Sequence, residues 1–301
     1  MPSLTAIIPA TNEPATLHRC RAAIDAARAA PEEVIVVSEP PLAGPAASRN
    51  AGARDAEGDV LVFVDADVEV HNDAFTHIRA AFEADPGLVA LFGSYDDAPS
   101  APGVVSAFRN LLHHDVHQQS AGPATTFWAG LGAVRREDFV NVGGFDAERY
   151  TVPSIEDIEL GMRLSAAGAR IELIPEIQGT HLKHWSLWGM VRTDFAQRGV
   201  PWVGLIIESR GSSALNLGMK HRVSALASVV GFGALALRRP RIALGSAAVL
   251  VALNRRFYGL LVRRRGVPEA AVGVLLHAVH HATSAAAVPV GVLRWARTRR
   301  S

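Results

Sequence analysis

Two acidic residues at the end of an apolar run constrain this chain more than any other feature. Residues 60–64 read Val-Leu-Val-Phe-Val, the length and composition of a fully buried strand, and Asp65-Ala66-Asp67 follow directly. Open α/β sheets bind ligands at the carboxyl ends of their strands. Neighbouring carboxylates repel each other unless a cation lies against them, so the pair predicts a divalent ion that could bridge to a diphosphate. A solvated acidic turn is the alternative interpretation.

Apolar runs alternate with helical patterns through the first part of the chain. Strands are predicted at 4–9, 34–37, 60–64, 88–93, 127–134 and 171–174. Helices are predicted at about 15–30, 46–56, 72–84 and 155–167. This alternation indicates an α/β fold with a mostly parallel sheet flanked by helices.

The charge of the chain is divided unevenly. The 301 residues carry a net charge of +1, but residues 210–301 hold 15 Lys and Arg against one acid, Glu269, which gives +14. Residues 1–209 hold the other 15 bases against 28 acids, which gives −13. We therefore expect two parts, an acidic domain over 1–210 and a basic, apolar helical region over 211–301.

The second part has three uncharged stretches, 223–237, 242–253 and 270–293, separated by arginine clusters. Only the last approaches the roughly 20 residues that span a bilayer. The shorter two fit a helical hairpin, a re-entrant segment or in-plane helices. Arginines between apolar helices are typical of the cytoplasmic side of a membrane, so we expect a membrane partner. A buried helical subdomain is the alternative, and nucleic acid is disfavoured because no aromatic stacking platform accompanies the arginines.

Cysteine usage and the chain start bear on the compartment. The single cysteine, Cys20, excludes an internal disulfide and fits a reducing compartment. The first residues show no basic segment followed by a signal-peptide apolar run. We therefore expect a cytoplasmic first domain at the cell membrane.

Further polar clusters are predicted near the same sheet edge. Asn12 and Glu13 follow the first strand, although they would also serve as a helix start. Arg49 could neutralise a phosphate or hold an acidic neighbour, and Asn50 could pin a loop. Glu156 and Asp157 open a later helix, either as ordinary complements of the helix dipole or with one of them as a general base.

Two histidines follow the last predicted strand. His181 and His184 lie in the segment Thr-His-Leu-Lys-His-Trp-Ser. A neutral imidazole there could complete an otherwise oxygen-rich metal shell. An exposed histidine beside a tryptophan is the alternative interpretation.

Together these motifs resemble the family 2 inverting glycosyltransferases of the GT-A fold. The resemblance covers about residues 3–185 and rests on Pro9, Asn12-Glu13 and the segments 47–52, 58–67, 130–136, 142–146 and 156–164. The rest of the chain is similar to a membrane-associated subset in which His-x-Lys-x-Trp-Ser precedes apolar helices, as 181–186 do here. The resemblance identifies 1–210 as the catalytic domain and 211–301 as the membrane-associating region.

The resemblance implies a role for each candidate residue. Asp65 and Asp67 would handle Mg²⁺ or Mn²⁺ and the diphosphate, with His181 as a further metal ligand and His184 as its alternative. Asp157 would be the catalytic base and Glu156 its neighbour and fallback. The residues implied at the nucleotide are Pro9, Asn12, Glu13, Glu39, Arg49, Asn50 and Asp65. Glu39 stands where the family commonly has an Asp pair, which leaves the base of the nucleotide open.

The implied activity is transfer of a sugar from a nucleotide-diphosphate donor to the hydroxyl of a lipid-linked or membrane-delivered acceptor. A sugar nucleotidyltransferase is one alternative, but it would normally have a Gly-rich basic loop where 10–14 stand. A non-catalytic membrane scaffold that kept the fold is another. A dinucleotide-binding oxidoreductase is disfavoured because no G-x-G-x-x-G follows the first strand.

Overall fold

The computed structural model describes residues 1–209 and 218–298, and their contacts divide the chain into two compact units. The first unit comprises Met1–Ser100 and Val116–Lys183, and the second comprises Ala101–Asp115 and His184–Ser301. The predicted boundary between 210 and 211 lies in a segment outside the described residues and stays a prediction.

The first unit is built on an eight-stranded sheet with the order β2-β1-β3-β7-β5-β8-β4, and β6 pairs with β8. The strands are β1 (Leu4–Pro9), β2 (Glu33–Val37), β3 (Val60–Val64), β4 (Val68–Val70), β5 (Leu88–Tyr95), β6 (Gly122–Ala124), β7 (Leu131–Arg135) and β8 (Arg170–His181). β1 runs parallel to β2 and β3, whereas β7 runs antiparallel between β3 and β5. The sheet is therefore mixed rather than mostly parallel, because apolar runs define strands but not their direction.

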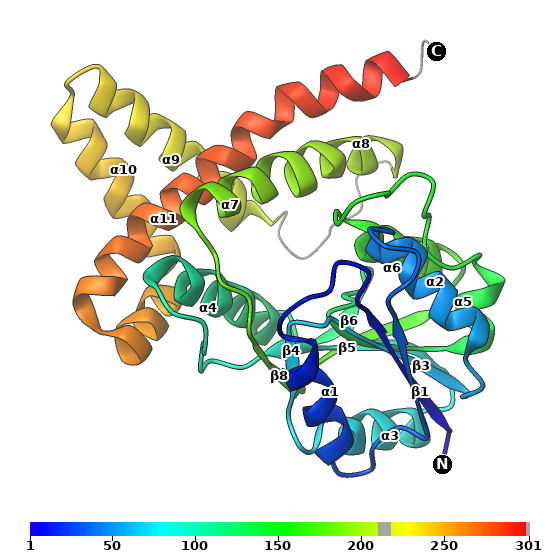
Figure 1. Ribbon diagram of the computed structural model, residues 1–301. Coiled ribbons are helices and arrows are strands. Elements are labelled where there is room, and N and C mark those ends of the chain that lie inside the picture. Colours follow the sequence, from blue (N-terminus) through cyan, green and yellow to red (C-terminus); the bar gives the residue numbers. More distant parts are fainter. Residues whose placement is uncertain (210–217, 299–301) are drawn as a thin grey trace. The chain divides into compact units, whose positions relative to one another are not determined.

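Helices cover both faces of this sheet, which confirms the predicted α/β layering (Figure 1). They are α1 (Leu17–Ala26), α2 (Pro45–Asp55), α3 (Ala74–Ala84), α5 (Arg136–Asn141) and α6 (Glu156–Ala166). α1 and α3 share one core with the alternate side chains of β1 and β3. On the other face, the ring of Phe63 lies 5.4 Å from Phe139 and 5.2 Å from Phe145, measured between centroids.

Strand register brings the predicted site segments to one edge. Pro9 pairs with Val37, and Ile7 pairs with Phe63, so Asp65 lies level with the end of β1. β8 is much longer than the predicted strand 171–174, because its polar second half pairs with β4 and β5. That extension pairs His181 with Val68, next to Asp67.

The second unit is helical and, among the described residues, has a core around Phe108, Trp185 and Phe257. Its elements are most of α4 (Val104–Gln119), α7 (Leu187–Arg192), the π-helix η1 (Thr193–Gly199), α8 (Val200–Glu208), α9 (Met219–Ala236), α10 (Pro240–Leu253) and α11 (Arg255–Thr298). α11 is broken at Gly266, where φ is 80°. Over the described residues, α11 is the one helix whose length and composition would allow it to cross a membrane.

The packing of α6 generates a first prediction. A Cβ on Gly161 would lie 2.1 Å from the backbone nitrogen of Phe127, so α6 cannot keep its position with any larger residue there. Gly161→Ala is expected to lower the free energy of unfolding by about 1–3 kcal/mol. Gly245→Ala in α10 is the control, since its Cβ meets no atom within 4 Å. Equal stability of the two variants in thermal unfolding would contradict this packing.

Candidate active site

A buried arginine joins the end of β3 to the start of α6. Arg49 lies on α2 and is 4% exposed. Its Nη2 donates to Oδ1 of Asp65 at 2.7 Å, and its Nη1 donates to Oε1 of Glu156 at 3.0 Å. Its guanidinium also lies 5.4 Å from the centre of the Phe145 ring. Of the two functions the sequence left open for Arg49, holding acidic neighbours is therefore the one seen in these contacts.

The charged groups in this cluster shift one another's pKa values. Burial alone would lower the pKa of Arg49, but the carboxylates around it raise that pKa and keep the guanidinium charged. Burial raises the pKa of Asp65; Arg49 opposes this shift and Asp67 adds to it. The cluster thus consists of a buried cation and the carboxylates from separate elements that it neutralises.

Glu156 and Asp157 differ in what their carboxyls do. Glu156 is buried, and while Oε1 faces Arg49, Oε2 accepts from the N–H of Ser154 at 2.8 Å. Asp157 is half-buried and accepts from the N–H groups of Ala129 (3.2 Å) and Ile158 (2.8 Å). Burial and the charge of Glu156 raise the pKa of Asp157 to about 6, although Arg49 and the two N–H donors act the other way. Asp157 is therefore a carboxyl whose proton exchanges near neutral pH.

Asp67 and His181 form the second part of the site. Oδ2 of Asp67 lies 3.7 Å from Nε2 of His181, and the ring of Tyr95 stacks on the His181 ring at 4.2 Å. Burial alone would raise the pKa of Asp67, but His181 and then Lys183 lower it overall. Of the pair Asp65 and Asp67, Asp67 is therefore the carboxylate that stays ionised more readily.

The side chains at this edge supply only part of the ligand shell of a divalent ion. Over residues 1–209 and 218–298, no group of three or more His, Cys, Asp or Glu side chains converges well enough to hold a metal ion. One oxygen of Asp65 already accepts from Arg49, while Asp67 and His181 offer one carboxylate and one imidazole. Two protein donors fit Mg²⁺ or Mn²⁺ when substrate phosphates and water fill the other positions.

The remaining predicted residues lie on loops and at a turn. Pro9 ends β1 and is half-buried, whereas Asn12, Glu13 and Glu39 are exposed on the loops after β1 and β2. His184 belongs to the second unit and is exposed. The assignments of these residues to a nucleotide or a metal stay predictions.

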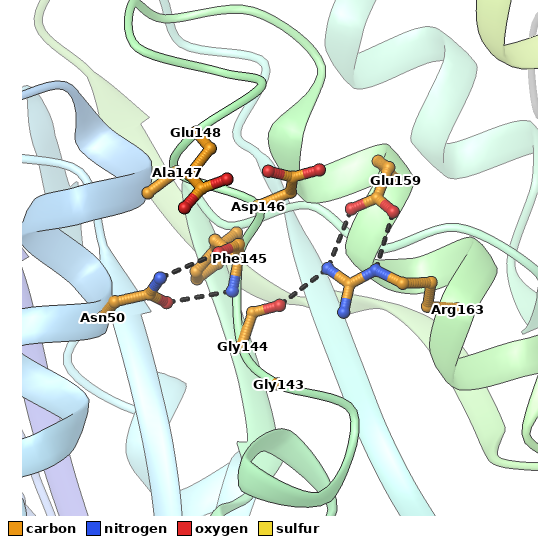
Figure 2. Close-up of a pocket in the computed structure, with 9 residues that line it drawn as sticks. All are labelled: Asn50, Gly143, Gly144, Phe145, Asp146, Ala147, Glu148, Glu159 and Arg163. Atoms are coloured by element: carbon orange, nitrogen blue, oxygen red, sulfur yellow. Dashed lines mark hydrogen bonds and ion pairs between the residues drawn. The ribbon is translucent and has the colours of Figure 1, made fainter.

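A pocket of about 460 Å³ adjoins Asn50. Figure 2 shows Asn50 bonded to both backbone polar groups of Phe145, at 2.8 and 2.9 Å. Across the pocket, Arg163 donates to Glu159 and to the carbonyl groups of Val142 and Gly144. These bonds fix the turn 143–148 between α2 and α6.

Sequence reasoning missed several residues that shape the site. The N–H of Ala129 leaves no signal, because any residue but proline supplies that donor. Tyr95 was detectable, since it lies two residues beyond the apolar run 88–93. Arg163 was also detectable, because Glu159 and Arg163 have the i,i+4 spacing of a helical ion pair.

Two family models match the chain. Residues 19–142 match the model described as Glycosyl transferase family 2, and residues 112–198 match the model described as N-terminal domain of galactosyltransferase. A solved structure, the mannosyltransferase PcManGT from Pyrobaculum calidifontis in complex with GDP-Man and Mn²⁺, has a TM-score of 0.54 to this chain at 16% identity. The likeness covers 95% of this chain and 87% of that one and shows a shared fold.

Two curated proteins are similar in sequence. The O-antigen biosynthesis protein RfbC of Myxococcus xanthus is 29% identical over 141 residues, which are 42% of this chain and 11% of that protein. The rhamnosyltransferase WbbL of Escherichia coli (strain K12) is 27% identical over 147 residues, 44% of this chain and 55% of that protein. The chain thus spans about half of one relative and a small part of the other. Together with the shared fold, these matches support a family 2 glycosyltransferase with the GT-A fold.

The arginine cluster generates a second prediction. Arg49→Met leaves Glu156 buried without its cation, so the free energy of unfolding is expected to fall by about 3–5 kcal/mol. Arg19→Met is the matched control, since Arg19 pairs with Glu69 at the surface and should change stability by only about 0–1 kcal/mol. Urea denaturation of the full chain measures both. An Arg49→Met protein as stable as the control variant would contradict the assigned role.

Proposed function

We propose that this chain is an inverting glycosyltransferase that moves a sugar from a nucleotide-diphosphate donor to an acceptor hydroxyl. The observation that carries the proposal is the carboxyl of Asp157, half-buried at the start of α6 with a pKa of about 6. The proposal is supported by the match of residues 19–142 to the Glycosyl transferase family 2 model and of residues 112–198, which include Asp157, to the galactosyltransferase model. A base with this pKa is ionised at neutral pH and still strong enough to accept a proton.

The reaction step follows from the carboxyls present. Asp157 accepts the proton of the acceptor hydroxyl while the hydroxyl oxygen forms its bond to the anomeric carbon. The bond from that carbon to the diphosphate oxygen breaks, and its electron pair leaves with the nucleoside diphosphate. One displacement of this kind inverts the configuration. Arg49 donates hydrogen bonds to the carboxylates of Asp65 and Glu156. Because those two carboxylates are paired with Arg49, the contacts support Asp157 as the base.

The donor would bind along the carboxyl edge of β1, β2 and β3. Asn12, Glu13 and Glu39 would contact the nucleoside, with Pro9, Asn50 and the Arg49–Asp65 pair behind them. Asp67 and His181, with Asp65 beside them, would hold Mg²⁺ or Mn²⁺. When bound, the ion supplies positive charge that offsets the charge growing on the leaving diphosphate.

The acceptor would be lipid-linked or membrane-delivered. The basic, apolar helices of the second unit support this, since they would keep the protein at the cytoplasmic face of the cell membrane. The predicted domains, a catalytic region over 1–210 and a membrane-associating region over 211–301, remain part of the proposal.

The donor and the metal are tested together. Detergent-solubilised protein is incubated with a panel of UDP-, GDP- and TDP-sugars and Mn²⁺ or Mg²⁺, and release of nucleoside diphosphate is measured. We expect release from one donor class, loss with a chelator, and a fall of about a hundredfold in Asp67→Ala. Asp25→Ala on the exposed side of α1 should match wild type. An unaffected Asp67→Ala would contradict the metal role, and no release together with no donor binding by calorimetry would contradict the transferase.

The base is tested by separating binding from turnover. Asp157→Asn is expected to lower turnover by about 10²–10⁴-fold and to leave donor affinity unchanged. Wild-type turnover should fall as the pH drops below about 6, because the raised pKa leaves Asp157 protonated there. Glu176→Gln, an exposed carboxyl on β8, serves as the control. Turnover in Asp157→Asn within tenfold of wild type would assign the base to another group.

A further inference from the structure

In the second unit, α9 and α10 form a hairpin, yellow in Figure 1, whose large apolar side chains face outward. Leu235 is 61% exposed, Leu237 75% and Leu244 71%. In α10, Leu250 is the one buried residue. Large apolar side chains exposed along both helices indicate an interaction surface rather than an ordinary solvated one.

The polar side chains of the hairpin are turned inward instead. Ser224 and Asn254 are buried, and Nδ2 of Asn254 donates to Oγ of Ser224 at 3.0 Å. Oγ of Ser228 donates to the carbonyl of Ser224 at 2.8 Å. These bonds join the base of α9 to the end of α10 and satisfy the polar groups internally. A hairpin whose outer surface contacts lipid must satisfy its polar groups internally in this way.

Basic residues lie at both ends of this hairpin. Arg238, Arg239 and Arg241 are exposed at the turn between α9 and α10. Lys220 and Arg222 lie near the start of α9, at the opposite end of the hairpin. Arg255 and Arg256 lie at the same end, because they follow α10 at the start of α11. Residues 219–256 contain no Asp or Glu. The surface that covers the hairpin must therefore be apolar and also carry negative charge.

The length of α10 and the charges at both ends of the hairpin disfavour a simple crossing. The 18 residues of α9 extend about 27 Å and the 14 residues of α10 about 21 Å, against a hydrocarbon core of about 30 Å. A re-entrant hairpin would carry the three turn arginines into hydrocarbon, and a spanning one would place one basic end on the outer side. When the hairpin lies flat, both basic ends reach the headgroups of one leaflet.

We propose that the α9–α10 hairpin lies in the plane of the membrane interface, with its apolar side chains in the acyl boundary and its basic ends on anionic lipid phosphates. This deepens the membrane association named in the proposed function and rests on it. Vesicle binding requires neither donor nor acceptor, so failure of this proposal and failure of the transferase are distinguishable.

The charge dependence is tested with the full-length chain and vesicles of phosphatidylcholine, with or without phosphatidylglycerol, at low salt. We expect flotation with the anionic vesicles and weaker binding to the neutral ones. Replacing Arg238, Arg239 and Arg241 by Gln should weaken anionic binding by about fivefold per charge, roughly a hundredfold in total. The matched control replaces three first-unit arginines by Gln: Arg21, Arg28 and Arg54. Equal loss in both triple variants would overturn the proposal.

The orientation of the hairpin is tested by measuring how deep labelled positions lie in the bilayer. Single cysteines replace Leu226, Leu237 or Leu244 in a Cys20→Ser background and carry an environment-sensitive fluorophore, which lipids brominated at different depths then quench. A flat hairpin predicts the same shallow depth at all three positions. A label at 237 that lies deepest would show a re-entrant hairpin and overturn the proposal. So would protein that ignores vesicles and dimerises through α9 and α10, because the occupant would then be a second copy.

Discussion

The site depends on one buried cation. Arg49 reaches from α2 to Asp65 at the end of β3 and to Glu156 at the start of α6. Without its charge, two carboxylates from separate elements would face each other in a poorly solvated region, a situation that proteins avoid because it costs several kcal/mol. With it, the acidic edge can persist, and Asp157 is left beside Glu156 with a raised pKa. The stability of the fold and the chemistry of the site therefore share one contact.

The sequence predicted the elements better than their geometry. The apolar runs at 4–9 and 60–64 became β1 and β3, because buried strands need continuous apolar residues, and the run at 34–37 became β2, a half-buried strand at the edge of the sheet. The antiparallel direction of β7 and the polar second half of β8 leave no such pattern, so neither was predictable. In the site, carboxylates are visible in a sequence, but the choice of Arg49 between a phosphate and its acidic neighbours depends on three-dimensional distance.

Within the second unit, the α9–α10 hairpin reverses the usual distribution of polarity. The hairpin buries Ser224 and Asn254 and exposes leucines, whereas α11 is held within the unit by His280, which contacts Asp194, the residue that also pairs with Arg109 of α4. Three arginines at the hairpin turn would cost roughly 8–10 kcal/mol at the centre of a bilayer. That cost outweighs the advantage of deeper insertion for helices of 14–18 residues. A surface position satisfies both the leucines and the arginines.

The central claim is that Arg49 binds the carboxylates of Asp65 and Glu156 and leaves Asp157 to act as the base. No carboxyl then attacks the sugar as a nucleophile. The most direct test is the anomeric configuration of the sugar released when water or methanol replaces the acceptor, read by proton NMR before mutarotation. A single displacement predicts a product with the configuration opposite to that of the donor. A product that keeps the donor's configuration would require a covalent intermediate on a nucleophile and would contradict the account.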